Sequence, residues 1–121
     1  MNNIKEYLNQ NRTMSFSSLL FQFIDNKGLK DSQVYNKANI DRRLFSRIRC
    51  NNYILNKINV IRLCISLNLN LDETHELLSS AGYSLSTNND FDLTIIYCIE
   101  NNIYDFNIIN DYLYALNKAI L

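Results

Sequence analysis

Residues 32–52 read SQVYNKANIDRRLFSRIRCNN, and this stretch is the most informative part of the chain about its fold. Its central run, residues 41–49, reads DRRLFSRIR. Wound as a helix at about 100° per residue, this run separates its apolar side chains from its arginines. The apolar side holds Leu44, Phe45 and Ile48, and the polar side holds Arg42, Arg43, Ser46 and Arg47. The pattern predicts a short helix over residues 41–50 with an arginine face.

The first turn of this predicted helix carries two positive charges, Arg42 and Arg43. The helix dipole is also positive there, so each cation costs about 0.3–1 kcal/mol unless an anion lies nearby. A phosphate is a suitable anion, because helix N-termini bind phosphate through their free N–H groups. The stretch therefore indicates a helix that binds an anion.

On the N-terminal side of this helix, the residues predict a second short helix and a tight turn. Asp31 suits the N-cap of a helix over residues 32–38. Asn39 tolerates the left-handed backbone that ends such a helix, and Ile40 is expected to fill the corner before Asp41 caps the arginine-faced helix. Two short helices joined by a tight turn are typical of a helix-turn-helix.

The remaining chain predicts further helices separated by short polar links. Apolar residues at helical spacing mark helices over residues 15–27, 57–67, 72–81, 90–100 and 106–119, and Gly28 and Gly82 end two of them. Residues 1–13 are polar and suit either a tail or a short helix. With no proline and short connections, the expected fold class is all-α, with one bundle over residues 14–83 and an acidic helical hairpin over residues 84–121 packed on it.

The net charge of zero hides a strong asymmetry along the chain. Residues 1–66 hold eleven basic and four acidic residues, whereas residues 67–121 hold one basic and eight acidic residues. A basic half suits nucleic acid. An acidic half suits a protein partner or self-association. Attraction between the two halves inside the fold is an alternative explanation of the same pattern.

The residue types favour neither catalysis nor metal binding. Cys50, Cys64 and Cys98 are too far apart for a metal or redox motif, and His75 is the single histidine. No phosphate loop or nucleophile motif is present, and no segment approaches the length of a membrane span. We therefore expect a cytoplasmic protein with reduced thiols, Cys64 and Cys98 in its core, no enzymatic activity, no cofactor or metal, and no membrane or small-molecule partner.

Several of these residues also resemble a known family. Gly28-Leu29, Ala38, Asn39-Ile40-Asp41, Phe45, Ile48 and the string LNLNLDETHELL, residues 67–78, are similar to the helix-turn-helix of phage repressors and Cro, the XRE type. The resemblance implies a repressor-like five-helix bundle whose third helix enters the DNA major groove. The family's base-facing positions correspond to Arg42, Arg43, Ser46 and Arg47, and its phosphate-facing positions to Asn51 and Asn52.

The chain departs from that family at four positions. Asp31 stands where glutamine is common, and its carboxylate is expected to repel phosphate. Tyr35 stands where a small alanine is common, Asn39 stands where the turn commonly has glycine, and Arg49 stands where an acidic residue is frequent. These departures concern the two helices that the resemblance places nearest to DNA and the turn between them.

A second resemblance covers more of the chain, from about Met14 to Ala115. The strings VYNKANIDRRLFSRIR, residues 34–49, and FDLTIIYCIENNIYD, residues 91–105, look like an uncharacterised bacterial module that is itself helix-turn-helix-like. This module occurs alone or fused to domains such as macro domains. The resemblance implies an all-helical fold and a sensing, tethering or regulatory role, and it implies no activity.

Two functional hypotheses follow. The first is a non-enzymatic regulator that binds double-stranded DNA as a dimer through the arginine face. The second is an adaptor or inhibitor of a phage-defence or toxin system, which uses the same face on an acidic protein partner. Under either, Tyr104 and Tyr114 are expected to contact a partner or a second copy, and Phe106 and Tyr112 to complete the core. Alternatively, the arginines form a solvated face paired with Asp41 and with acids of the C-terminal half.

Overall fold

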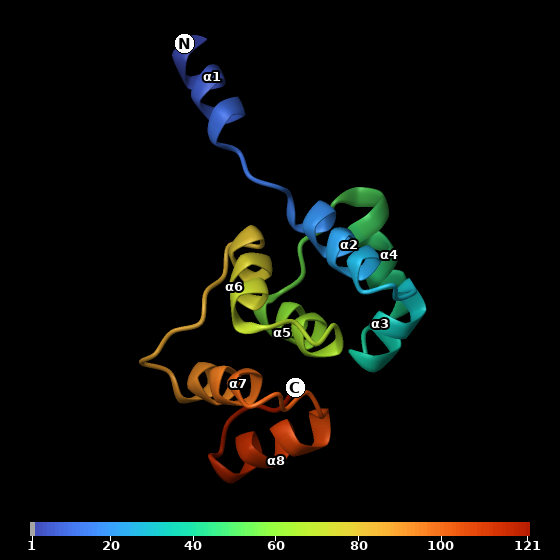
Figure 1. The fold of residues 1–121 in the computed structure, drawn as a ribbon, viewed down its shortest axis with the longest axis vertical. Helices are drawn as coiled ribbons and strands as arrows, with labels where there is room; N and C mark the ends of the chain where they lie inside the picture. Colours follow the sequence, from blue (N-terminus) through green and yellow to red (C-terminus); the bar gives the residue numbers. More distant parts are fainter. Residues whose placement is uncertain (1) are drawn as a thin grey trace.

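The computed structural model describes residues 2–121, including every side chain in this range except those of Asn2 and Asn51. Within this range the chain forms eight helices and no strand, so the predicted all-α class is confirmed. The helices are α1 (Asn2–Asn11), α2 (Phe16–Asn26), α3 (Asp31–Lys37), α4 (Arg42–Asn51), α5 (Lys57–Ser66), α6 (Leu71–Ser80), α7 (Asp90–Glu100) and α8 (Phe106–Ala115). The ribbon is drawn in Figure 1.

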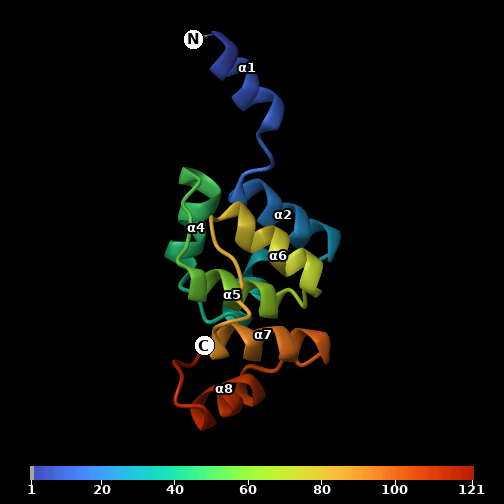
Figure 2. The same ribbon diagram turned by 90° about the vertical axis from the view of Figure 1, so that its left-hand side faces the viewer.

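Helices α2 to α6 form the body of the molecule. Helices α7 and α8 pack together at one end of it, and α1 projects from the other end (Figures 1 and 2). One cluster of buried side chains contains residues from every helix from α2 to α8, among them Leu20, Ile48, Leu77 and Ile95. All described side chains of α1 are exposed. Of the two forms expected for residues 1–13, the short helix is therefore the one observed, and it is not docked.

Three connections between helices use the same three-residue turn. Each turn consists of a residue with a left-handed backbone, an apolar residue packed in or against the core, and the N-cap of the next helix: Gly28-Leu29-Lys30, Asn39-Ile40-Asp41 and Asn68-Leu69-Asn70. The amide N–H of the apolar residue donates to the carbonyl oxygen five residues earlier, at 2.9 Å for Ile40 and 3.1 Å for Leu29 and Leu69. These bonds satisfy carbonyls at the end of the preceding helix. The predicted roles of Asn39 and Ile40 are confirmed.

Two helix ends differ from the prediction. The N-cap of α3 is Lys30 and not Asp31, because the side-chain oxygen of Gln33 accepts the Lys30 amide N–H at 2.8 Å and the helix begins one residue earlier. The last helix ends at Ala115 and not near Ala119. Asn117 takes a φ of 55°. The Asn110 side-chain oxygen then accepts the Leu121 amide N–H at 2.7 Å, and the Asn110 side-chain amide donates to the Leu121 carbonyl at 3.1 Å.

Asn39 offers a direct test of the repeated turn. Its φ is 55°, a conformation that costs a residue with a Cβ and no local side-chain hydrogen bond about 1–2 kcal/mol. We expect Asn39→Ala to lower the free energy of unfolding by about that amount, measured by urea denaturation followed by circular dichroism. Asn39→Gly is the control and should change stability by a few tenths of a kcal/mol at most, since glycine adopts this conformation freely. Equal losses in both variants would contradict the explanation.

Ion pairs join the basic and acidic halves at two places. Lys57 Nζ lies 2.8 Å from Asp92 Oδ2, and Lys27 Nζ lies 3.8 Å from Glu73 Oε1. Asp92 is only 1% exposed, and its Oδ2 also accepts the amide N–H of Ser86 at 2.8 Å. Attraction between the two halves was one expected explanation of the charge asymmetry. The Lys57–Asp92 pair is an example, because it joins α5 to α7.

Candidate nucleic-acid interface

Helix α4 is held in place from both ends and from its buried side. The Asp41 side chain caps its N-terminus by accepting the Arg43 amide N–H at 2.7 Å. Phe45 and Ile48 are buried, and the Ser17 hydroxyl of α2 donates to the Ile48 carbonyl at 3.0 Å. The opposite side of α4 is therefore presented to solvent in a fixed orientation.

The exposed side of α4 is the arginine face, which consists of Arg42, Arg43, Ser46 and Arg47. All four side chains are exposed, as the periodicity predicted. None of the three arginines makes an ion pair within the described part of the chain. The expected alternative, in which Asp41 and acids of the C-terminal half pair with these arginine side chains, is not observed among the described residues. Three like charges thus lie close together without neutralisation.

Arg49 lies beside this face but is already paired. Its Nε and Nη2 donate to both carboxylate oxygens of Asp31, at distances from 2.8 to 3.1 Å, and its Cζ lies 3.8 Å from the ring centroid of Phe21. A two-pronged guanidinium–carboxylate pair of this kind is a strong, well-oriented interaction. The Asp31 carboxylate was expected to repel phosphate. Its charge is instead neutralised by Arg49, another of the departures from the family pattern.

A hollow of about 390 Å³ lies between α3 and α4, next to the arginine face. Its lining combines charged, hydroxyl and aromatic side chains: Lys30, Asp31, Ser32, Tyr35, Arg42, Phe45, Ser46 and Arg49. The Tyr35 ring packs against the Phe45 ring with centroids 5.4 Å apart. Tyr35, which is larger than the family's usual alanine, thus forms part of the wall of the hollow.

The other residues predicted to contact DNA follow α4. Asn52 is exposed and ends the helix with a left-handed backbone, φ 54°. It lies next to the last turn of the arginine face, where the resemblance expects a phosphate contact. The side chain of Asn51 lies outside the described residues.

The aromatic residues of the C-terminal half are arranged differently from the expectation. Tyr104 is half-buried, and its hydroxyl donates to the Leu69 carbonyl at 2.7 Å. Burial, reinforced by the Glu73 carboxylate, raises the pKa of Tyr104. The Tyr104 hydroxyl is therefore already hydrogen-bonded inside the molecule. Tyr114, in contrast, is 79% exposed and makes its side chain available to a partner. The core assignment of Tyr112 is wrong, since it is 39% exposed, but Phe106 does pack against the core.

Cys64, Cys98 and the single histidine lie apart from the arginine face, whereas Cys50 is on α4, with its Sγ 3.9 Å from the Oγ of Ser46. Cys64 and Cys98 are buried as predicted, and burial raises the pKa of the Cys64 thiol to about 12. His75 is exposed on α6. Within residues 2–121, no three histidine, cysteine or carboxylate side chains gather as metal ligands. Nor is any described helix both long enough and apolar enough to span a membrane.

The chain was compared with models of protein families, with curated proteins and with solved structures, and none matched. The main functional feature of the described residues is the arginine face of α4, which is unpaired and held in a fixed orientation. The hollow between α3 and α4 is its immediate neighbour.

Proposed function

We propose that this protein is a non-enzymatic DNA-binding regulator in which α3 and α4 act as a repressor-like helix-turn-helix. In this proposal α4 lies in the major groove of double-stranded DNA. The observation that carries the proposal is the set of three exposed, unpaired arginines on one side of a helix whose other side is buried. Arginine can bind the O6 and N7 atoms of guanine with two hydrogen bonds. Ser46 adds a hydroxyl that suits any base or phosphate.

Two features of the charge distribution support an orientation in which α4 faces the DNA. Arg49 neutralises Asp31 at 2.8 Å, which reduces the repulsion of a phosphate near the start of α3. The acidic pair of helices α7 and α8 lies at the end of the molecule away from α4 (Figures 1 and 2). With the arginine face on the duplex, the acidic end points away from the phosphates, so the two halves do not oppose each other in binding.

A second candidate function is an adaptor or inhibitor that places the same basic face on an acidic protein partner, in the regulation of a phage-defence or toxin system. The hollow between α3 and α4 favours this candidate. Its volume of about 390 Å³ suits a side chain of a partner, and its rim presents Arg42 and Lys30 to a carboxylate. Asp31 and Arg49 also line the hollow, where their charged groups pair at 2.8 Å.

The salt dependence of DNA binding tests the first candidate. We expect the full chain to bind a pool of fluorescent random-sequence duplexes at low salt, measured by anisotropy. The logarithm of the binding constant should fall with the logarithm of salt with a slope of about −3 or steeper, since each neutralised phosphate contributes about −0.9. Absence of binding at low salt, together with co-purification with an acidic protein, would instead favour the adaptor.

A further inference from the structure

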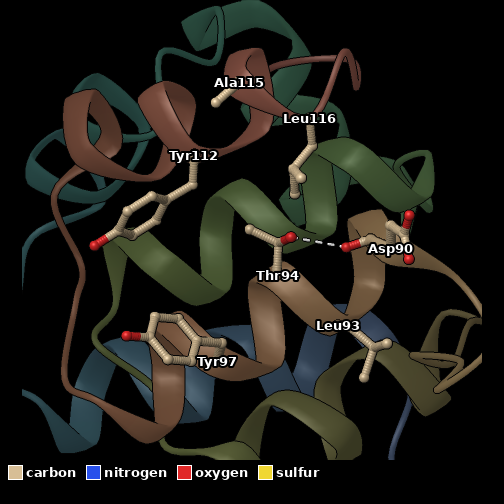
Figure 3. Close-up of a pocket in the computed structure, with 7 residues that line it drawn as sticks. All are labelled: Asp90, Leu93, Thr94, Tyr97, Tyr112, Ala115 and Leu116. Atoms are coloured by element: carbon tan, nitrogen blue, oxygen red, sulfur yellow. Dashed lines mark hydrogen bonds between the residues drawn. The ribbon is translucent and has the colours of Figure 1, made fainter.

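A second surface, at the opposite end of the molecule from α1, is an open apolar groove between α7 and α8. It encloses about 570 Å³ and is lined by Asp90, Leu93, Thr94, Tyr97, Tyr112, Ala115 and Leu116. Figure 3 shows Tyr112 of α8 and Leu116, the residue just after α8, reaching toward Thr94 and Tyr97 on α7. The rings of Tyr97 and Tyr112 meet edge to face, with centroids 6.1 Å apart. Large apolar side chains are thus grouped on this surface and left uncovered.

The exposure of these side chains is considerable. Tyr97 is 53% exposed, and Leu116 is 49% exposed. Only Ile109 and Leu113 of α8 are fully buried, because α8 is the outermost helix and packs mainly on α7. Grouped apolar side chains of this kind, when exposed, mark sites of protein interaction. The groove is therefore suited to a partner with an apolar face.

Helix α1 has such a face and nothing covering it. Ile4, Tyr7 and Leu8 follow the spacing i, i+3, i+4, which places them on one side of the helix. They are between 45% and 61% exposed. An isolated ten-residue helix is marginal in water and usually gains its stability from packing. The chain thus contains both an apolar groove between two helices and a separate amphipathic helix.

The charges of the two surfaces are complementary. Residues 86–121, which contain the groove, hold five acidic residues and one basic residue. Asp90 lines the groove itself. Helix α1 and its link carry Lys5 and Arg12 against a single acid, Glu6, and they continue into the basic half of the chain. Opposite charges on two surfaces guide their association and set its orientation.

The position of α1 favours docking between two copies. Residues 12–15 link it to α2, and four extended residues span at most about 14 Å. Thr13 and Met14 of this link line a small hollow with Leu19 of α2 and Ser79 of α6, so the link lies against these two helices while α1 itself projects beyond them. The groove between α7 and α8 lies at the other end of the body in both views (Figures 1 and 2).

We propose that α1 of one copy docks in the α7–α8 groove of a second copy, and that two copies exchange this contact in an antiparallel dimer with a two-fold axis. An amphipathic helix in an apolar groove is a recurrent mode of recognition, anchored at positions i, i+3 and i+4. The antiparallel arrangement forms two equivalent contacts and closes the assembly. It also places Lys5 of α1 and Arg12 of the link in each copy near the acidic α7–α8 pair of the other. This dimer does not depend on whether α4 binds DNA.

Substitutions on each side of the contact test the dimer in the full chain. We expect Leu8→Asp in α1 and Leu116→Asp in the groove each to raise the dimer dissociation constant by about a hundredfold, since each change affects both contacts. Asn9→Asp and Asn107→Asp add the same charge to exposed positions on α1 and α8 outside the proposed contact and should leave it within about twofold. Sedimentation velocity across a concentration series measures the constants, and circular dichroism checks that helix content is kept.

A mixture of the two disrupted variants gives a sharper result. The Leu8→Asp chain keeps its groove, and the Leu116→Asp chain keeps its α1, so a mixed dimer retains one intact contact. The mixture should therefore dimerise more tightly than either variant alone. A wild-type protein that stays monomeric, or variants that dimerise like their controls, would overturn the proposal. Species that grow beyond the dimer with concentration would overturn the two-fold arrangement.

Discussion

Lys57→Met is expected to lower the free energy of unfolding by about 3 kcal/mol. The reason is Asp92, which is 1% exposed and has Lys57 Nζ 2.8 Å from its carboxylate. Removing one partner of a buried ion pair leaves an uncompensated charge, at a cost of about 3–5 kcal/mol. The low end of this range applies because the Lys57 side chain is 32% exposed and the Ser86 amide N–H still donates to the carboxylate. Urea denaturation at neutral pH measures the loss.

Two further variants distinguish the buried charge from a general effect of losing a lysine. Lys118→Met makes the same change at an exposed position that forms no ion pair among the described residues, and it should alter stability by no more than about 0.5 kcal/mol. The double variant Lys57→Met/Asp92→Asn removes the unpaired charge and should recover more than half of the loss. A double variant as unstable as Lys57→Met would mean that the lysine acts through packing instead.

Arg43→Gln and Arg47→Gln are each expected to weaken binding to the preferred duplex by about 1–3 kcal/mol, or roughly 5- to 150-fold. Both side chains are exposed on α4 and unpaired among the described residues, so their loss should leave the fold intact. Selection from a random duplex pool identifies the preferred sequence, and fluorescence anisotropy then measures affinity for it and for single-base changes.

The matched control for these variants is Arg62→Gln on α5, which removes the same charge from a side chain that bonds within its own helix, to Asn59 at 3.0 Å. It should change affinity by far less than the α4 variants. If an α4 variant weakens binding to all duplexes equally, its arginine contacts phosphate and carries no base discrimination. If neither variant changes DNA affinity, the arginine face does not contact DNA.

Local sequence chemistry was sufficient to predict the helices and the turn before α4. Apolar residues at helical spacing marked the buried sides, and the structure places Phe45 and Ile48 where that spacing put them. Asn39 and Ile40 could be assigned because the left-handed residue and the apolar residue after it act within a few positions of each other. The exposed arginine face follows from the same periodicity, since burying one side of α4 leaves the other outside.

The features that could not be predicted depend on contacts between distant segments. Arg49 and Asp31 are 18 residues apart, and nothing in either helix alone indicates their pairing. Tyr104 lies at a position that suits an interface, yet it is placed to donate to the Leu69 carbonyl in another connection. Tyr112 has the spacing of a core residue, but only one helix covers α8 closely enough to bury its neighbours Ile109 and Leu113. Periodicity identifies an apolar side and does not say how much of it is covered.

The three repeated turns have a consequence for the speed of folding. Each turn joins two helices that are consecutive in the chain. At two of the turns the joined helices also pack against each other, α3 against α4 and α5 against α6. Proteins dominated by contacts between segments close in sequence fold in roughly microseconds to milliseconds, because little chain entropy is lost before the contacts form. Because the chain has no proline, these turns also contain no X–Pro bond and no slow isomerisation step. The body that presents the arginine face should therefore assemble quickly from neighbouring helices.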